Sequence, residues 1–289
     1  MKKNHYGLPA IILASFFFAT FSALNRIVPQ SVGTFHQLLI RTFLMGSIFL
    51  IIGFIRRDFS KILKKDYLLI LLRGLFIIGD FATFFIAISH LQIGVTLFLF
   101  YASVIISNYI YGSLVLHEKL DKVKIFSLLL AVVGLGIMYI NNLGAFVSIF
   151  VIFALFSGFS YGLGVASSKS LDKYSVTQVN SMAFLCAAFL SIPLLFISHE
   201  QSSITFMSIP FFPFFIWSGV GVLAFYLIIY GFKHVEAHKA SLISLSEIIF
   251  AIFIGLLIYN EIPTLQTIIG GICIIIALAL PNLKWKSKK

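Results

Sequence analysis

The chain has 289 residues, of which 60% are hydrophobic and 11% are charged, and its mean hydropathy is +1.05. A soluble protein of this size could not cover its surface with polar groups at that composition, so a soluble globular domain is excluded. The formal net charge of +11 suits either a nucleic-acid binder or a membrane protein with basic loops, and the positions of the charges decide between them.

Ten apolar segments follow one another along the chain. A helix needs about 20 apolar residues to cross a bilayer. The nearly continuous runs at 68–88 and 248–259 lack the period-two alternation of a transmembrane β-barrel. We therefore predict an all-α integral membrane fold with ten transmembrane helices at 6–28, 34–55, 67–89, 93–116, 123–140, 146–168, 176–197, 209–232, 240–259 and 264–281.

Lysines and arginines occur in every second gap between these helices. They lie in both tails and after the even-numbered helices, for example Arg56, Lys119, Lys169 and Lys233, whereas the other gaps hold none. The positive-inside rule then predicts cytoplasmic termini and a multi-pass protein of a bacterial inner or plasma membrane. Because topology accounts for the basic charge, we expect the lipid bilayer and no nucleic acid as a partner.

Two short patterns recur in the two halves of the sequence. Glu118 and Glu261 directly follow the fourth and ninth helices and are 143 residues apart, and His90 and His234 are 144 residues apart. Similar spacing with an equal number of helices between the copies indicates a duplication. We name the short segments around Glu118 and Glu261 the glutamate tags.

The duplication predicts one five-helix repeat over 1–143 and a second over 144–289. Five is an odd number, so the second repeat enters the membrane from the opposite side and the two are inverted. Lysines surround Glu118 and none surround Glu261, as expected for tags on opposite sides. Inverted repeats give a fold two equivalent arrangements, one open to each side, which is the basis of alternating access.

The chain also resembles a known family. The stretches Arg41-Thr-Phe-Leu and Arg73-Gly-Leu and the two glutamate tags are similar to those of the drug/metabolite transporter (DMT) superfamily, in its EamA-domain family. The resemblance covers essentially the whole chain. It implies transport of small metabolites, and substrates of relatives include amino acids, nucleotide-linked metabolites and S-adenosylmethionine.

Two buried charges in the first repeat are candidate site residues, since an ionisable residue in a span costs roughly 2.5–3.5 kcal/mol. Arg41 lies in the outer part of the second helix, where its planar fork suits a substrate carboxylate or phosphate, or a buried carboxylate as structural partner. Asp80 lies near the middle of the third helix. It suits pairing with Arg41, proton coupling, or binding of a substrate ammonium.

Arg73 and Glu247 are the corresponding candidates nearer the cytoplasmic side. Arg73 is placed to extend its charge to the headgroups, and Glu247 to take up a proton for coupling or to pair with Arg73. Relatives commonly have a proline after the position of Glu247, and this chain has Ile248 there and Ile105 in the first repeat. The four charges sum to zero, which favours ion pairs.

Uncharged residues complete the predicted cavity. Tyr101, Asn108 and Tyr111 share one face of the fourth helix by their spacing, and we include them as substrate-binding candidates. Gly158 and Gly162 are four residues apart in the sixth helix, which favours close helix packing.

The remaining groups receive structural interpretations. Cys186 and Cys273 lie in apolar runs, so no disulfide, metal or cofactor is expected. Glu236, His238 and Lys239 are interpreted as a solvated helix start.

Our leading hypothesis is a secondary transporter, not an enzyme, for an amino acid or a related amphipathic compound, since Arg41 with Asp80 suits a zwitterion. A nucleoside-type metabolite such as S-adenosylmethionine is the alternative substrate, with protons as the possible coupling ion. No G-x-x-x-x-G-K-[ST] loop supports an ATP-driven pump. A channel and a membrane enzyme are the alternatives from other classes, although the histidines do not cluster as an enzyme site requires.

Overall fold

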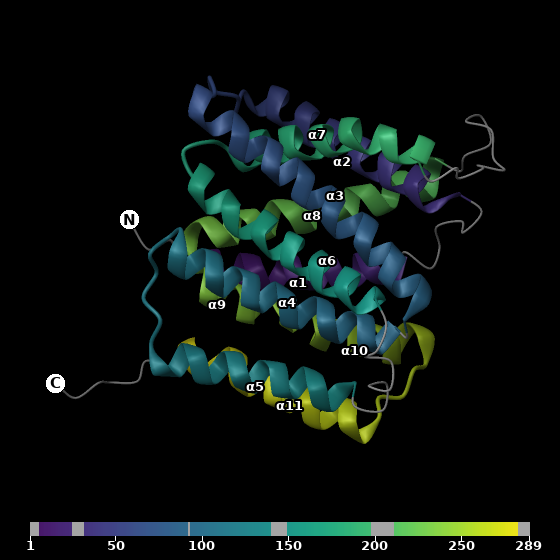
Figure 1. The fold of residues 1–289 in the computed structure, drawn as a ribbon, viewed down its shortest axis with the longest axis vertical. Coiled ribbons are helices and arrows are strands. Elements are labelled where there is room, and N and C mark those ends of the chain that lie inside the picture. Colours follow the sequence, from purple (N-terminus) through teal and green to yellow (C-terminus); the bar gives the residue numbers. More distant parts are fainter. Residues whose placement is uncertain (1–5, 25–31, 92, 140–148, 198–210, 283–289) are drawn as a thin grey trace.

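A computed structural model describes residues 6–24, 32–91, 93–139, 149–197 and 211–282, and these form helices and short connections (Figure 1). The α-helices are α1 Gly7–Leu24, α2 Thr34–Arg56, α3 Tyr67–His90, α4 Ile93–Leu114, α5 Lys122–Met138, α6 Phe150–Ala166, α7 Val176–Ile197, α8 Phe211–His234, α9 Ala237–Ser244, α10 Ser246–Tyr259 and α11 Leu265–Ala279. Short 3₁₀ segments are η1 Lys64–Asp66, η3 Ser167–Leu171 and η5 Leu280–Asn282. The tail lysines used for the topology prediction, Lys2, Lys3, Lys284, Lys286, Lys288 and Lys289, lie outside the described residues.

Each of the ten predicted segments coincides with a helix, and the ninth is divided at Leu245 into α9 and α10. Within the described residues, eight helices are long and apolar enough to cross a membrane, with α9 and α10 counted together. The other two, α5 and α11, have 17 and 15 residues. Eight of the ten predicted segments are thus candidate membrane spans by length and composition, and α5 and α11 are shorter than expected.

Helices of the two sequence halves pack against each other throughout the bundle. The most extensive contacts pair α1 with α8, α2 with α7, α3 with α6, α4 with α6, and α5 with α11. By their order along the chain, α1 corresponds to α6, α2 to α7, α3 to α8 and α5 to α11. Exchange of each helix for its counterpart turns the α1–α8 pair into the α6–α3 pair and leaves the α2–α7 and α5–α11 pairs unchanged, so the contact pattern is symmetric. The α5–α11 pair lies at one end of the long axis (Figure 1).

The two glutamate tags have the same local conformation. His117 and Asn260 have φ of 53° and 54°, and the amides of Glu118 and Glu261 donate to the carbonyls of the glycines six residues earlier, at 2.8 and 3.0 Å. The glutamate side chain folds back against the same glycine in both tags, since a Cβ on Gly112 or Gly255 would lie 3.1 or 2.9 Å from the glutamate Oε2. Along the direction of the helices, the α4–α5 and α10–α11 connections lie at opposite ends of the bundle, at the left and the right of Figure 1.

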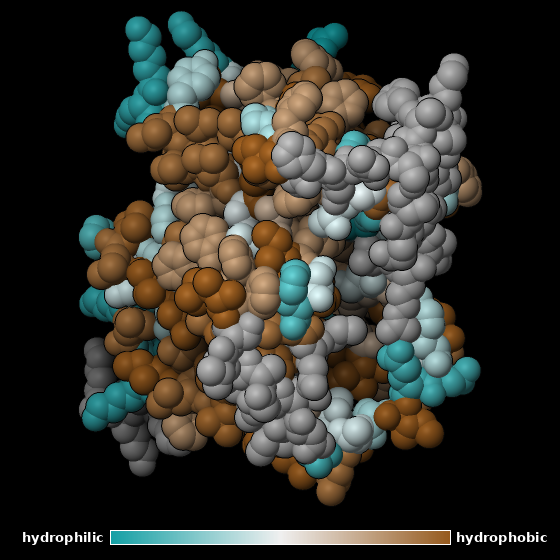
Figure 2. All heavy atoms as spheres, turned by 45° about the vertical axis from the view of Figure 1, so that its right-hand side comes forward, coloured by the Kyte–Doolittle hydropathy of each residue, from teal (hydrophilic) through white to brown (hydrophobic). Residues whose placement is uncertain are grey.

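We name the end where α1 begins and α4 ends the basic end, and the other the opposite end. The surface between them is mostly apolar (Figure 2), with side chains such as Phe189, Phe196 and Leu257 more than 70% exposed. The interior core contains Phe49, Trp217 and other large side chains of α2, α7 and α8. Large apolar groups on the outside as well as the inside are expected where lipid replaces water as the solvent.

Candidate functional site

A cavity of about 140 Å³ lies between helices of the two halves. Its walls are formed by α1, α3 and α4 of the first half and α6, α8 and α10 of the second. Most of the lining is aromatic: Phe18, Phe21, Phe81, Phe84, Phe100, Tyr101, Tyr161 and Phe225. Exposed Ser22, near the end of α1 away from the basic end, lies at its edge. The cavity therefore sits toward the opposite end of the bundle.

Two carboxyl groups line this cavity, Asp80 from α3 and Glu247 from α10. Asp80 is buried and accepts a hydrogen bond of 2.8 Å from the Ser157 hydroxyl of α6. The Tyr101 hydroxyl is the hydrogen-bond partner of Glu247. Two of the predicted site residues from the first repeat, Asp80 and Tyr101, and one from the second are thus brought together.

A break in the ninth segment positions Glu247. The amides of Leu245 and Ile248 donate to carbonyls three residues earlier, which ends α9 and starts α10 after one tightened turn. The carbonyl of Ser244 accepts a hydrogen bond of 3.2 Å from Ser15 of α1. Glu247 falls in the first turn of α10, where the helix dipole favours a negative charge. The break forms without the proline of relatives, since Ile248 occupies that position.

Arg41 does not line the cavity. It is 2% exposed, donates from Nη2 to Gln37 Oε1 at 2.8 Å, and its guanidinium lies 3.8 Å from the centroid of the Trp217 ring on α8. Among the described residues, no ion pair joins Arg41 to Asp80, so the pairing favoured by charge balance is not formed. Trp217 was not singled out from the sequence, because nothing there places it opposite Arg41.

Arg73 lies beyond Asp80 toward the basic end. It lines a narrower space of about 20 Å³ that shares Asp80 and Tyr161 with the main cavity. Arg73 as a whole residue is 4% exposed, so its charge does not extend to the headgroups as expected. It donates to the Gly164 carbonyl, and at 3.4 Å to Ser167 and Asn180. Within the described chain it forms no ion pair with Glu247.

The other candidates on α4 separate along the helix. Tyr101 lines the cavity, Asn108 is 1% exposed, and the Tyr111 hydroxyl bonds the Ser170 hydroxyl at 2.8 Å near the basic end. The prediction for Gly158 and Gly162 is confirmed: a Cβ on Gly158 would overlap the Phe100 backbone of α4. This close packing brings Tyr161 to the cavity wall.

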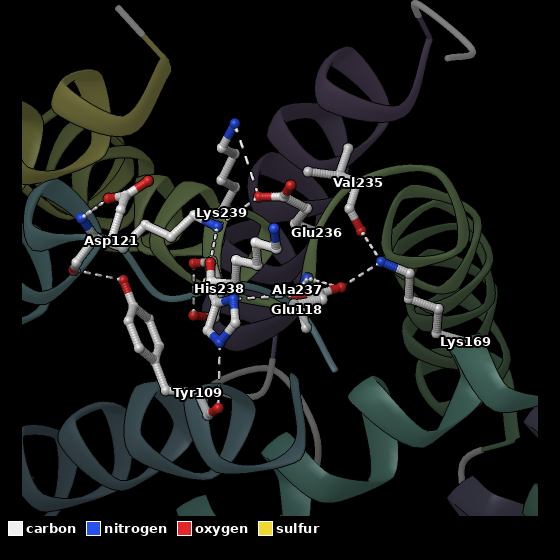
Figure 3. A network of polar contacts seen from close by, with 12 residues as sticks. Tyr109, Glu118, Asp121, Lys169, Val235, Glu236, Ala237, His238 and Lys239 are labelled. Atoms are coloured by element: carbon white, nitrogen blue, oxygen red, sulfur yellow. Dashed lines mark hydrogen bonds and ion pairs between the residues drawn. The ribbon is translucent and has the colours of Figure 1, made fainter. Parts of the chain in front are cut away.

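A polar network joins elements of the two halves at the basic end (Figure 3). The Glu118 carboxylate contacts Lys169 Nζ at 2.5 Å, His238 Nδ1 at 3.1 Å and the Ala237 amide at 2.8 Å. Lys169 also donates to the Val235 carbonyl at 2.9 Å. These contacts connect the α4–α5 connection of the first half to η3 and the start of α9 in the second.

The network holds a charged carboxylate. Burial opposes ionisation of Glu118, but the contact with His238 and the hydrogen bonds from Lys169 and the Ala237 amide outweigh it and lower the pKa of the carboxyl to about 2. His238 is fully buried, and its Nε2 lies 3.2 Å from the Tyr109 carbonyl. The interpretation of this region as a solvated helix start is therefore wrong for His238, although the Glu236 side chain is 46% exposed.

Sequence reasoning missed most of the cavity wall. The chain has 33 phenylalanines, so the few that line the cavity do not stand out. A signal exists in α6, where Ser157, Ser160 and Tyr161 interrupt an apolar helix, and Ser157 and Tyr161 face the cavity or its carboxyl group.

Comparison with known proteins agrees with this architecture. The model of the EamA-like transporter family matches residues 5–140 and again 148–283. No match was found among curated proteins. One crystal structure of a protein is similar in fold, with a TM-score of 0.80 over 98% of this chain and 99% of that chain at 14% identity. Since the family model covers nearly the whole chain in two copies, this protein belongs to the EamA-like transporter family and is a multi-pass membrane transporter of the drug/metabolite type.

Proposed function

We propose that this protein is a secondary transporter that moves a small amphipathic metabolite by alternating access. The observation that carries the proposal is the cavity at the interface of the two halves, lined by three helices from each. A substrate bound there contacts both halves, so a movement of one half against the other changes the side to which it is exposed.

The two halves act as inverted repeats in this proposal. The symmetric contact pattern and the matching glutamate tags at opposite ends of the bundle support the inversion. The cavity lies toward the opposite end, and the Glu118 network connects the halves at the basic end. The described arrangement corresponds to a carrier closed at the basic end.

Lysines and arginines of the loops support a cytoplasmic basic end, and therefore cytoplasmic termini in a bacterial inner or plasma membrane. Single cysteines introduced at Ser22 and at Lys122, with Cys186 and Cys273 replaced by alanine, test this orientation in whole cells. An impermeant thiol reagent should label the first and not the second, and the reverse pattern would contradict the topology.

Asp80 and Glu247 are the groups we propose for proton coupling, because both carboxyls face the cavity and neither has a basic partner among the described residues. The transport test is counterflow in proteoliposomes with a panel of amino acids and other small amphipathic metabolites, with and without a pH gradient. A carrier shows saturable flux that is accelerated by substrate on the other side. Flux that neither saturates nor exchanges would identify a channel, and chemical conversion of the substrate would identify an enzyme.

A further inference from the structure

We propose that the cavity selects a small organic cation, an ammonium group attached to an apolar body of about one aromatic ring. This inference rests on the proposed transport function and narrows the substrate class of the same site. It differs from the zwitterion that the sequence favoured, because Arg41 contacts Trp217 instead of the cavity.

The charged residues that line the cavity are all acidic. Asp80 and Glu247 are both carboxyls, and no lysine, arginine or histidine is among the described residues that line the main cavity. A substrate carboxylate would enter beside two acidic groups with no cation to pair with, and burial of an unpaired charge is costly. A substrate ammonium would find an acidic partner on either side.

The hydrogen bonds of the two carboxyls carry the second step. One hydroxyl donates to each, Ser157 to Asp80 and Tyr101 to Glu247. A carboxylate offers about four acceptor positions, so both groups retain acceptors for the three N–H donors of an ammonium. Asp80 and Glu247 come from different halves of the chain, and a cation held by both would bridge α3 and α10.

The aromatic wall carries the third step. Phe18, Tyr161 and Phe225 form edge-to-face pairs, with centroids 5.0 Å apart for Phe18–Phe225 and 6.3 Å for Phe18–Tyr161. Phe100 packs against Tyr161 with centroids 5.7 Å apart. Ring faces attract cations within about 6 Å, and cages of aromatic rings bind ammonium groups in this way. The same rings bury an apolar body.

Size limits the part of the ligand that the cavity holds inside its edge at Ser22. The cavity of about 140 Å³ is close to the ~150 Å³ of an engineered cavity that binds benzene. The space that continues toward Arg73 is about 20 Å³, which accommodates little more than one water molecule. A carboxylate therefore does not fit beside Arg73, whose donors are directed at Gly164, Ser167 and Asn180.

The test compares compounds with one body and different charges. Binding of 2-phenylethylamine, phenylalanine, 3-phenylpropionate and 2-phenylethanol to the purified full-length protein is measured by displacement of radiolabelled 2-phenylethylamine and by calorimetry. We expect 2-phenylethylamine to bind at least tenfold more tightly than phenylalanine and 3-phenylpropionate. Equal or tighter binding of phenylalanine, or no saturable binding of the amine, would overturn the inference.

Substitution of each cavity carboxyl tests whether these groups select the amine. Asp80→Asn and Glu247→Gln should each weaken amine binding at least tenfold while leaving the weak binding of 2-phenylethanol unchanged, which also shows that the cavity remains folded. Asp172→Asn, which removes an exposed carboxylate, is the matched control. Amine binding that survives both cavity substitutions would refute the proposed site. Saturable counterflow of zwitterions without amine selectivity would refute this inference and leave the transport function standing. Selective amine binding without flux would refute the transport function and leave the amine selectivity of the cavity standing.

Discussion

The Glu118→Gln substitution tests whether the network at the basic end holds the two halves together. The amide keeps the shape of the side chain but removes the charge that contacts Lys169 and His238. The pKa of Glu118 is lowered from 4.5 to about 2, and its side chain is 9% exposed, so solvent screens it little. At about 1.4 kcal/mol per pKa unit, the shift corresponds to ~3 kcal/mol, a figure within the ~3–5 kcal/mol lost when one partner of a buried ion pair is removed.

If the network forms only when the basic end is closed, the loss of ~3 kcal/mol raises the open population about 100-fold while that state remains the minor one. The reporter is Ile229→Cys, in a background with Cys186 and Cys273 replaced by alanine, because Ile229 is fully buried and lines the narrow space near Arg73. An impermeant cationic thiol reagent is added from the basic side of the membrane.

We expect Glu118→Gln to increase the labelling rate of Ile229→Cys at least tenfold. Lys239→Gln is the control, because Lys239 lies in the same region but contacts Glu236 only at 3.8 Å. Equal labelling rates in the parent and the Glu118→Gln variant would refute the reasoning that this network keeps the basic end closed.

Three further predictions concern the same molecule. Because its pKa is lowered, Glu118 stabilises the closed end above about pH 4.5 and loses this effect as the pH falls toward 2. The reactivity of the thiol itself falls with pH, so the measurement is the ratio of Ile229→Cys labelling rates in the Glu118→Gln variant and the parent. This ratio should stay constant from pH 8 to 5, and a fall within that range would contradict the pKa. Gly158→Ala should lower stability by about 1–3 kcal/mol through overlap with α4, whereas Gly164→Ala, with its nearest contact at 3.4 Å, should not, as thermal unfolding would show. Arg41→Gln should lower the melting temperature but leave amine binding unchanged, and a loss of binding would place Arg41 in the site.

Much of the fold could be predicted because transmembrane helices are encoded locally. Runs of apolar residues mark each helix, and every predicted segment coincides with one. The glutamate tags were detectable for the same reason, because each lies within one short segment: a residue with positive φ precedes the glutamate, and the glutamate amide donates to the carbonyl of a glycine six residues earlier. The lengths of α5 and α11 were less predictable, because helix ends depend on capping and packing.

The site was only partly predictable. Asp80, Glu247 and Tyr101 were identified because charged and polar side chains are rare in a span and require a reason. The contact partners of the charged residues were not identified, because a balance of charges does not say which groups lie close together. Arg41 stacks on Trp217, and Asp80 accepts a hydrogen bond from Ser157. His238 was misinterpreted because its neighbours Glu236 and Lys239 are polar, and the sequence does not reveal that Glu118 covers it.

The sequence by itself determined that this chain lies in a membrane, where its helices are, and that its two halves are copies, because hydropathy, loop charge and spacing are properties of short segments. Only the tertiary structure decided which charges meet, since each contact depends on helices distant in sequence. In it Arg41 lies outside the cavity and two carboxyls lie among aromatic rings, and these positions support the proposal of a cation in place of a zwitterion.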